Sequence, residues 1–232
     1  MIVGGILAGG TGSRMENAKI PKQFLEIKGI PIIIRTINAF RDCPDIDVLV
    51  IAMNPDWMEY CKNVLYKFNV SLENIYLIAG GTDRFASMEN IVQKCIELGG
   101  EETILIVHDC ARPFVNNRII KDNVEMLKEY DMLTTSLPTI DTVLLSKDQK
   151  CSTEVPNREE VFLDQGPQTF VAGEFHRMAS SLSTEQKEKY MEAGRLYLAF
   201  GKKVGIVRGD RMNFKITTEF DLKFAEYLLN NN

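Results

Sequence analysis

The sequence has no excess of positive charge and no long hydrophobic segment. Its 32 acidic residues outnumber its 27 basic residues, which gives a formal net charge of -5. Proteins that bind duplex nucleic acid normally carry a basic stripe that neutralises phosphates, so this class is disfavoured. A phosphorylated small molecule needs only a local cluster of cations. The net negative charge therefore does not exclude a phosphorylated small molecule as the ligand.

Paired cysteine motifs are also absent. The five cysteines are odd in number and none has the Cys-x-x-Cys spacing of zinc or redox sites, which favours a reducing compartment. The apolar N-terminal residues 1–8 are interrupted by glycines, have no basic segment before them and lead into Arg14, Lys19 and Lys22. This pattern fits neither a signal peptide nor a membrane span. We therefore expect a cytoplasmic protein.

Strand and helix patterns alternate four times in the first 130 residues. Strands are predicted at residues 3–7, 47–53, 75–79 and 103–108. Each strand is followed by a predicted helix: residues 32–40, a helix that ends at residue 68, residues 84–98 and residues 118–130. Such alternation requires right-handed crossovers. It predicts one α/β domain over residues 1–232, with a Rossmann-like, mostly parallel twisted sheet flanked by helices.

The pattern changes after Pro138. Residues 141–145 and 155–162, separated by a polar turn, predict an extended β-arm at about residues 138–165. An arm of this kind usually packs on another surface. Helices at 174–182 and 184–200, a strand at 203–207 and a final helix from Thr218 complete the chain, and Thr218 with Asp221 predicts a capping box.

A glycine-rich loop follows the first predicted strand. Such a loop lets backbone amides approach a phosphate, although a tight turn without a ligand would use the same glycines. No Gly-Lys-Ser/Thr closes a Walker loop, and Met15 replaces the third glycine of the dinucleotide fingerprint. Arg14 and Lys22 favour the phosphate role, because an arginine can bind a phosphate through two parallel hydrogen bonds and a lysine can act on it as a point charge. The candidate nucleotide-binding residues here are Leu7, Ala8, Gly9, Gly10, Thr11 and Gly12.

Several motifs, in order along nearly the whole chain, resemble the cytidylyltransferases of acyclic sugar-alcohol phosphates. Two branches are relevant: ribitol-5-phosphate cytidylyltransferase and 2-C-methyl-D-erythritol 4-phosphate cytidylyltransferase. The matching segments are residues 8–15, 21–24, 80–84, 107–113, 141–142, Arg158, 167–168 and 213–217.

The resemblance implies attack of a polyol phosphate on the α-phosphorus of CTP, with release of pyrophosphate. A phosphate monoester is largely ionised at pH 7, so no general base is required. Arg14 and Lys22 match the positions that stabilise the transition state, and Asp109 matches the position that binds Mg²⁺. The segment that holds cytosine and ribose matches Gly80, Gly81, Thr82, Asp83, Arg84 and Ser87.

Structural roles remain open for some of these residues. Thr82 or Asp83 would also cap the following helix, and Asp109 would also cap a strand end or pair with Arg112. His108 is expected to be structural.

The resemblance also implies a binding site for the second substrate. Arg158 and Lys215 match positions that hold its phosphate, and Arg112 and Thr142 complete the predicted substrate-binding set. Taken alone, each would be an ordinary exposed residue. The family's arm reaches across a homodimer, which leaves open whether Thr142 and Arg158 serve their own chain or the neighbouring subunit.

Two departures from the family pattern affect the second substrate. Gly166 replaces a usual threonine, and Met212 replaces the aspartate usual in the methylerythritol branch, with Asp210 as an unproven substitute. Met212, the opening residues 5–12 and Phe24 resemble the ribitol branch, so we expect D-ribitol 5-phosphate and a CDP-ribitol product. Methylerythritol phosphate is the alternative. A non-catalytic nucleotide sensor would be expected to lose Arg14, Lys22 or Asp109, and Met15 disfavours a nicotinamide oxidoreductase.

Overall fold

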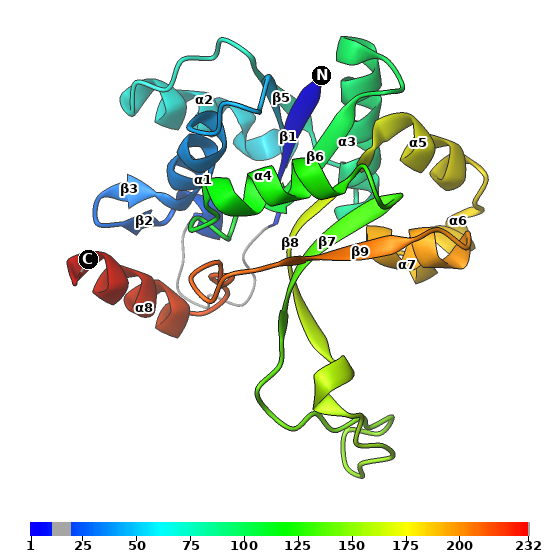
Figure 1. Ribbon diagram of the computed structural model, residues 1–232. Coiled ribbons are helices and arrows are strands. Elements are labelled where there is room, and N and C mark those ends of the chain that lie inside the picture. The colour runs from blue at the N-terminus through cyan, green and yellow to red at the C-terminus, as the bar shows by residue number, and fades with distance from the viewer. Residues whose placement is uncertain (11–19, 232) are drawn as a thin grey trace.

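The computed structural model describes residues 1–10 and 20–231, in which seven strands form one sheet (Figure 1). The strand order is β5-β4-β1-β6-β8-β7-β9. Only β8 runs antiparallel to its neighbours within the described sheet. The mostly parallel sheet is therefore confirmed. Its strands are β1 (Ile2–Ala8), β4 (Val48–Met53), β5 (Ile75–Ala79), β6 (Ile104–Asp109), β7 (Met132–Pro138), β8 (Phe162–Val171) and β9 (Val204–Arg208).

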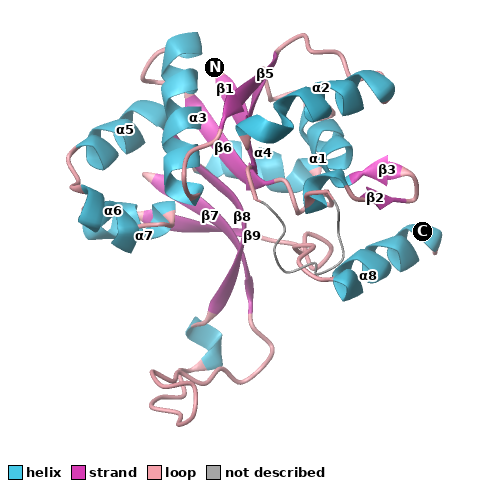
Figure 2. Cartoon of the chain, turned by 180° about the vertical axis from the view of Figure 1, so that it is seen from behind, coloured by secondary structure: helices cyan, strands magenta, loops and turns pink. Residues whose placement is uncertain are grey.

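Helices cover both faces of the sheet, as the two opposite views show (Figures 1 and 2). One buried apolar cluster joins the sheet to α1, α2, α4 and α8, and a second joins it to α3, α5 and α7. A small hairpin of β2 (Glu26–Ile27) and β3 (Ile30–Pro31) precedes α1. The helices are α1 (Ile32–Arg41), α2 (Met58–Lys67), α3 (Arg84–Gly99), α4 (Asn117–Met126), α5 (Ala172–Ser180), α6 (Thr184–Lys189), α7 (Ala193–Ala199) and α8 (Glu219–Asn230).

The central strand β1 is buried on both faces, which explains its apolar sequence. Gly4 of β1 lies against the side chains of Phe40 in α1 and Leu49 in β4. A Cβ there would come within 2.7 Å of Phe40 Cδ1 and 2.6 Å of Leu49 Cδ2. Glycine is therefore needed for close packing at this point of β1.

The arm differs from the prediction in its details. Both views show the segment between β7 and β8 projecting from the body (Figures 1 and 2). Residues 139–161 are all described and contain no strand, only an isolated bridge between Leu145 and Glu154 and a 3-10 turn, η3 (Arg158–Glu160). The predicted β-arm at about residues 138–165 therefore has strand only at its two ends, in β7 and β8. This segment is largely exposed, so its apolar residues do not mark a buried strand in this chain.

Other elements were also missed or misjudged, among them β7, for which no strand was predicted. The second half of β8 was not predicted, because Gly166-Pro167 interrupts the pattern expected of a strand. The helix predicted at 184–200 is two helices, α6 and α7, separated at Glu192, whose extended backbone precedes α7. The capping box of Thr218 and Asp221 at the start of α8 is confirmed. Within residues 1–10 and 20–231, none of the helices has the length and apolar character needed to cross a bilayer.

Candidate active site

A cavity of about 390 Å³ opens at the carboxyl ends of β1 and β6. Ligands of open α/β sheets usually bind at this edge. Its walls come from the end of β1 with Gly9 and Gly10, from the turn before α3, from residues 109–111 after β6 and from Lys215. We call it the glycine-loop cavity.

The turn before α3 is held by a short chain of hydrogen bonds. Gly81 N donates to Ser87 Oγ at 3.0 Å, and that hydroxyl donates to Asp83 O at 2.8 Å. Asp83 Oδ1 accepts from Ala86 N at 2.8 Å and caps α3, so the helix-capping alternative is confirmed for Asp83. A Cβ on Gly81 would lie 2.3 Å from Ala86 Cβ, which only glycine avoids. The turn is thus fixed in shape before any ligand binds.

Lys22 enters the cavity from the short 3-10 turn η1 (Lys22–Phe24). Its neighbour Gln23 is buried and donates from Nε2 to Ala8 O at 2.8 Å. Phe24 packs edge-on against Tyr60, with ring centroids 4.8 Å apart. These contacts anchor the turn to the end of β1, and they position Lys22 beside Gly9 and Gly10.

Asp109 lies between two cations at the end of β6. Lys215 Nζ is 2.6 Å from Oδ2 and Arg84 Nε is 3.6 Å from Oδ1. Burial alone would raise the pKa of Asp109, but Arg84 and Lys215 outweigh it and hold that pKa well below its usual range. Asp109 is therefore a carboxylate at neutral pH.

Arg112 and His108 lie near the carboxylate of Asp109. Arg112 donates from Nη1 to Asn213 O at 2.9 Å, which ties the turn after β6 to the segment that carries Lys215. His108 Nε2 lies 3.0 Å from Arg112 O, and burial lowers the pKa of His108 to about 4. The neutral imidazole therefore donates to this carbonyl. This geometry agrees with the structural role expected for His108.

The structure brings most of the predicted residues together. Gly80 lies beside the cavity and donates its N–H to Met53 O, and Arg112 lines a neighbouring cavity. Thr142 and Arg158 lie on the arm, outside the lining of both cavities in this single chain. Thr11, Gly12 and Arg14 lie outside the described residues. The predicted residues that line the glycine-loop cavity are Leu7, Ala8, Gly9, Gly10, Lys22, Gly81, Thr82, Asp83, Arg84, Ser87, Asp109 and Lys215.

The neighbouring cavity, of about 300 Å³, shares Arg84, Asp109 and Lys215 with the first. We call it the β8 cavity, because residues 164–166 and Gln168 of β8 form much of its wall. Glu192, at the start of α7, also lines it and lies 3.0 Å from Arg84 Nη1. Sequence reasoning assigned no role to Gln168 or Glu192. Gln168 follows Pro167 in one of the segments that match the family, whereas no feature of the sequence singled out Glu192.

Asp210, the candidate substitute for the aspartate that position 212 lacks, makes hydrogen bonds within its own loop and to the start of α4. Its Oδ1 accepts from Met212 N at 2.9 Å and its Oδ2 accepts from Asn116 Nδ2 at 3.4 Å. The carboxylate is therefore used to hold its own loop against α4. Asp210 also lies outside the lining of both cavities.

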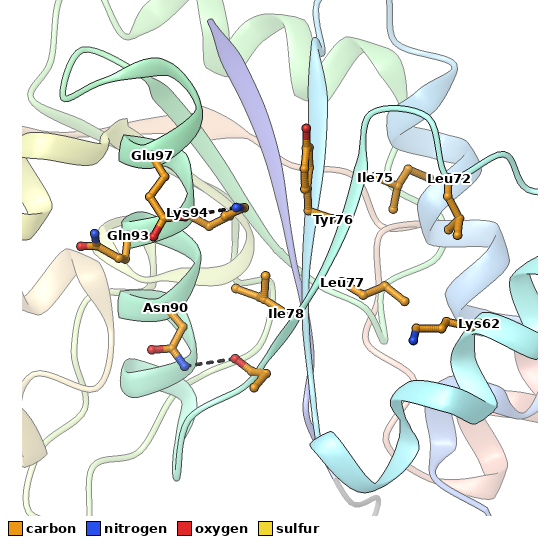
Figure 3. A pocket seen from close by; sticks show the side chains of 11 residues that line it. Lys62, Leu72, Ile75, Tyr76, Leu77, Ile78, Asn90, Gln93, Lys94 and Glu97 are labelled. Carbon is orange, nitrogen blue, oxygen red and sulfur yellow. Dashed lines mark hydrogen bonds and ion pairs between the residues drawn. The ribbon is translucent and has the colours of Figure 1, made fainter.

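A larger groove, of about 580 Å³, follows the free edge of β5 between α2 and α3 (Figure 3). Its charged side chains are already paired, as in the Lys94–Glu97 contact of 3.1 Å. It also lacks the glycine turns and the convergent charges of the glycine-loop cavity. Its size reflects an open sheet edge, so we place the functional site at the carboxyl ends of the strands.

The fold and the site together define a nucleotidyltransferase: a Rossmann-like α/β sheet with two glycine turns, cations and a carboxylate at its carboxyl edge. The family model described as 2-C-methyl-D-erythritol 4-phosphate cytidylyltransferase matches residues 2–231. The chain belongs to this family, and it is therefore a cytidylyltransferase.

Solved structures agree with this assignment. The 4-diphosphocytidyl-2C-methyl-D-erythritol synthase of Anaerococcus prevotii is 25% identical with a TM-score of 0.81, covering 99% of this chain and 96% of that chain. The 2-C-methyl-D-erythritol 4-phosphate cytidylyltransferase of Francisella tularensis is 26% identical with a TM-score of 0.81, covering 97% and 98%. The enzyme of the same name from Thermus thermophilus is 25% identical with a TM-score of 0.73, covering 99% and 100%.

Proposed function

We propose that this enzyme transfers a cytidylyl group from CTP to the phosphate of a short polyol phosphate and releases pyrophosphate. The observation that carries the proposal is the pair of adjoining cavities with Asp109 and Lys215 in their shared wall, in a chain of a cytidylyltransferase family. The glycine-loop cavity would take the nucleotide and the β8 cavity the acceptor. The reacting groups would then meet at the shared wall.

The chemistry demands alignment and charge neutralisation more than proton transfer. The acceptor phosphate is already ionised at pH 7, so it attacks the α-phosphorus without a base. Negative charge then grows on the leaving pyrophosphate and on the oxygens of the reacting phosphorus. Lys22 beside the glycine turn would stabilise this charge, with Arg14 as its predicted partner, and Lys215 would hold the acceptor phosphate.

The residues fit a magnesium ion that the nucleotide itself would help to hold. Within the described residues, no group of three or more His, Cys, Asp or Glu side chains forms a metal cage. Asp109 is an ionised oxygen ligand at the cavity wall, and Mg²⁺ is commonly bound by one or two carboxylates plus phosphate oxygens and waters. Bound Mg²⁺ would supply charge neutralisation on the phosphates. Arg84 and Lys215, which pair with Asp109, would then be released toward the phosphates.

Two acceptors compete for the second cavity. The family description and the names of the similar structures favour 2-C-methyl-D-erythritol 4-phosphate over the ribitol 5-phosphate expected from the sequence. Met212 favours ribitol 5-phosphate, because neither position 212 nor Asp210 supplies to the cavity linings the carboxylate typical of the methylerythritol branch.

A pyrophosphate-release assay tests the proposal. CTP, UTP, ATP and GTP would each be offered with Mg²⁺ and with either polyol phosphate. CTP is expected to react far faster than the other three, because residues 81–83 line the cavity and a small pocket at this turn would exclude purines by shape. Equal rates with ATP, or no release with any acceptor, would contradict the proposed function.

We also expect the arm to pack on a second copy of the chain. It exposes Ile140, Leu144 and Val155, each at least 59% accessible, which is unusual for a protein surface that stays unpaired. Light scattering on the full chain and on a variant with Ile140→Ser, Leu144→Ser and Val155→Ser would measure this. A dimer that becomes a monomer is the expected result.

All five cysteines are free, so we expect the enzyme to work in a reducing compartment such as the cytosol.

A further inference from the structure

The groove along the edge of the sheet has β5 as its floor and the helices α2 and α3 on its two sides (Figure 3). β5 ends the strand order, so among the described residues one of its sides has no neighbouring strand. Edge strands are normally protected by a proline, a charged side chain or a bulge. Ile75–Ala79 contains neither proline nor a charged residue, and its register with β4 is continuous. The edge is therefore open to another strand.

The main-chain groups of β5 alternate between β4 and the groove. Asn74 O accepts a hydrogen bond from β4 at 2.8 Å, and Gly80 N donates one to β4 at 2.7 Å. Successive residues of a strand direct their main-chain groups to opposite sides, so the even-numbered residues of this segment face β4. The odd-numbered residues, Ile75, Leu77 and Ala79, therefore face the groove.

Two of the groove-facing groups are already paired, one at each end of the strand. Ile75 N donates to Leu72 O at 3.1 Å, and Ala79 O accepts from Asn90 Nδ2 at 3.1 Å (Figure 3). Between these contacts, the groups without a hydrogen-bond partner in the described part of the chain are Ile75 O, Leu77 N, Leu77 O and Ala79 N. They follow one another as acceptor, donor, acceptor and donor. This is the order that an extended peptide complements with its own main chain.

The two sides of the groove differ in polarity. Ile75 and Leu77 point to the side of α2, where Leu72 adds an apolar side chain that is 51% exposed. The side formed by α3 is polar and carries Asn90, Gln93, Lys94 and Glu97. The side chains of an added strand would point alternately to these two sides. The groove therefore fits a segment in which apolar and polar residues alternate.

The shape of the groove favours a single extended segment over a second copy of β5. A second copy would bring its own α2 and α3 against the helices that border this groove, whereas a lone segment brings only its main chain and short side chains. The space, of about 580 Å³, shares no lining residue with the glycine-loop cavity or the β8 cavity. An occupant here would therefore leave both cavities open to substrates.

We infer that the edge of β5 is a docking site for an extended segment of a partner protein, in which apolar and polar residues alternate, and that this segment joins the sheet as an additional strand. Hydrogen bonds to the main chain of Leu77 and its neighbours supply the affinity, and the unlike sides of the groove supply the specificity. The inference goes beyond the transferase reaction and does not depend on it. Because Ala79 leads directly into Gly80 and Gly81, the partner is held next to the nucleotide turn.

Calorimetry of the full chain with a synthetic peptide tests the inference. The probe is acetyl-Glu-Val-Thr-Val-Thr-Val-Glu-amide, which alternates valine with polar residues. One control peptide has proline in place of the central valine, and the other has the same composition with the three valines adjacent. The probe should bind at least about tenfold more tightly than either control, because only the probe combines free main-chain groups with the required alternation.

Amide hydrogen exchange locates the bound peptide. The N–H groups of Leu77 and Ala79 face the groove, so they should exchange rapidly in the free protein and at least about tenfold more slowly with the probe bound. The N–H groups of Tyr76 and Ile78 face β4 and are internal controls. They should exchange slowly in both states.

Two variants separate docking from folding. Leu77→Pro removes a groove-facing N–H and keeps the hydrogen bonds to β4, since proline is tolerated on an edge strand. Gln93→Trp fills the groove from the surface of α3 and leaves β5 unchanged. Each should weaken probe binding by at least about tenfold with an unchanged far-UV circular dichroism spectrum. Glu125→Trp, on the exposed surface of α4, is the matched control and should bind the probe normally.

Three results would overturn the inference. The first is no binding of the probe to the wild-type protein, or binding that leaves exchange at Leu77 unchanged. The second is an unchanged probe affinity in Gln93→Trp, which tests the groove even if Leu77→Pro does not fold. The third is protection of Leu77 and Ala79 in the protein alone as its concentration rises, because the occupant would then be a second copy of the chain.

Discussion

Lys215 Nζ lies 2.6 Å from Asp109 Oδ2, although the two residues are 106 positions apart in the sequence. One follows the strand β9 and the other ends the strand β6. Their contact closes the wall between the two cavities, so the same pair connects the C-terminal segment to the sheet and separates the two proposed substrates.

This pair gives a prediction about pH. The pKa of Asp109 is depressed in the folded protein, so the ionised form stabilises the fold at neutral pH. The contribution is complete above the unfolded value, near 4, and is lost as the pH falls through the lower folded value. A double-mutant cycle with Asp109→Asn and Lys215→Met should give a coupling of about 1 kcal/mol at pH 7, because Lys215 is partly exposed and screened. Urea denaturation at pH 7 and near pH 3 measures it. A coupling that grows on acidification would contradict the assignment.

Lys22 should matter for turnover far more than for folding. Lys22→Ala removes a preorganised cation from the wall of the glycine-loop cavity, and kcat should fall on the order of a hundredfold or more. The buried anchors of the turn, Gln23 and Phe24, remain in place, so the melting temperature should change little. Lys62→Ala, an exposed lysine of α2, is the control. Near-normal kcat in purified Lys22→Ala would refute the role, and the same assay on Arg14→Ala tests the partner predicted from the sequence.

Ser87 should control nucleotide affinity. Ser87→Ala removes both the acceptor for Gly81 N and the donor to Asp83 O, which loosens the turn that shapes the cavity. We expect KM for CTP to rise by about 5 to 30-fold, the equivalent of one or two hydrogen bonds, with a smaller change in KM for the acceptor. Ser181→Ala removes a serine hydroxyl at the end of α5 and should leave both values unchanged. An equal rise in both KM values would indicate general damage to the site.

A buried polar triad should make a large contribution to stability. Asn123 of α4 donates to Thr135 Oγ1 and accepts from Thr169 Oγ1, both at 2.9 Å, and all three side chains are fully buried. Asn123→Leu leaves two hydroxyls without a partner and should lower the free energy of unfolding by about 2 to 4 kcal/mol. Adding Thr135→Val and Thr169→Val should recover part of this loss. Urea denaturation of the single and triple variants checks both statements, and a triple variant less stable than Asn123→Leu would argue against them.

Local signals in the sequence predicted the part of the fold that follows local rules. The apolar run at residues 104–107 is buried on both faces of the sheet, and Thr218 with Asp221 caps α8 as expected. The glycine turns and Lys22 were found for the same reason, since each is encoded within a few neighbouring residues. The capping of α3 by Asp83 was predicted as an alternative to a role in nucleotide binding.

The acceptor side was harder to predict, because distant segments build it. β8 lies between β6 and β7 out of chain order, and it carries a glycine and a proline that are more typical of a loop. Glu192 reaches the cavity only because the chain bends between α6 and α7, which no residue pattern marked. Chemistry that depends on long-range pairing leaves no trace in local periodicity. The roles of Thr142 and Arg158 stay predictions, because both residues lie on the arm outside the lining of the two cavities, and the resemblance leaves open which subunit they serve.

The strand β8 leaves the arm at Phe162 and forms the cavity wall from Asp164 onward, only two residues later. Over such a short extended segment the chain has almost no slack, so the base of the arm and the wall of the β8 cavity are parts of one continuous strand. A shift of the arm would therefore be expected to reach the cavity wall through the backbone of β8, without any direct contact between the arm and the acceptor.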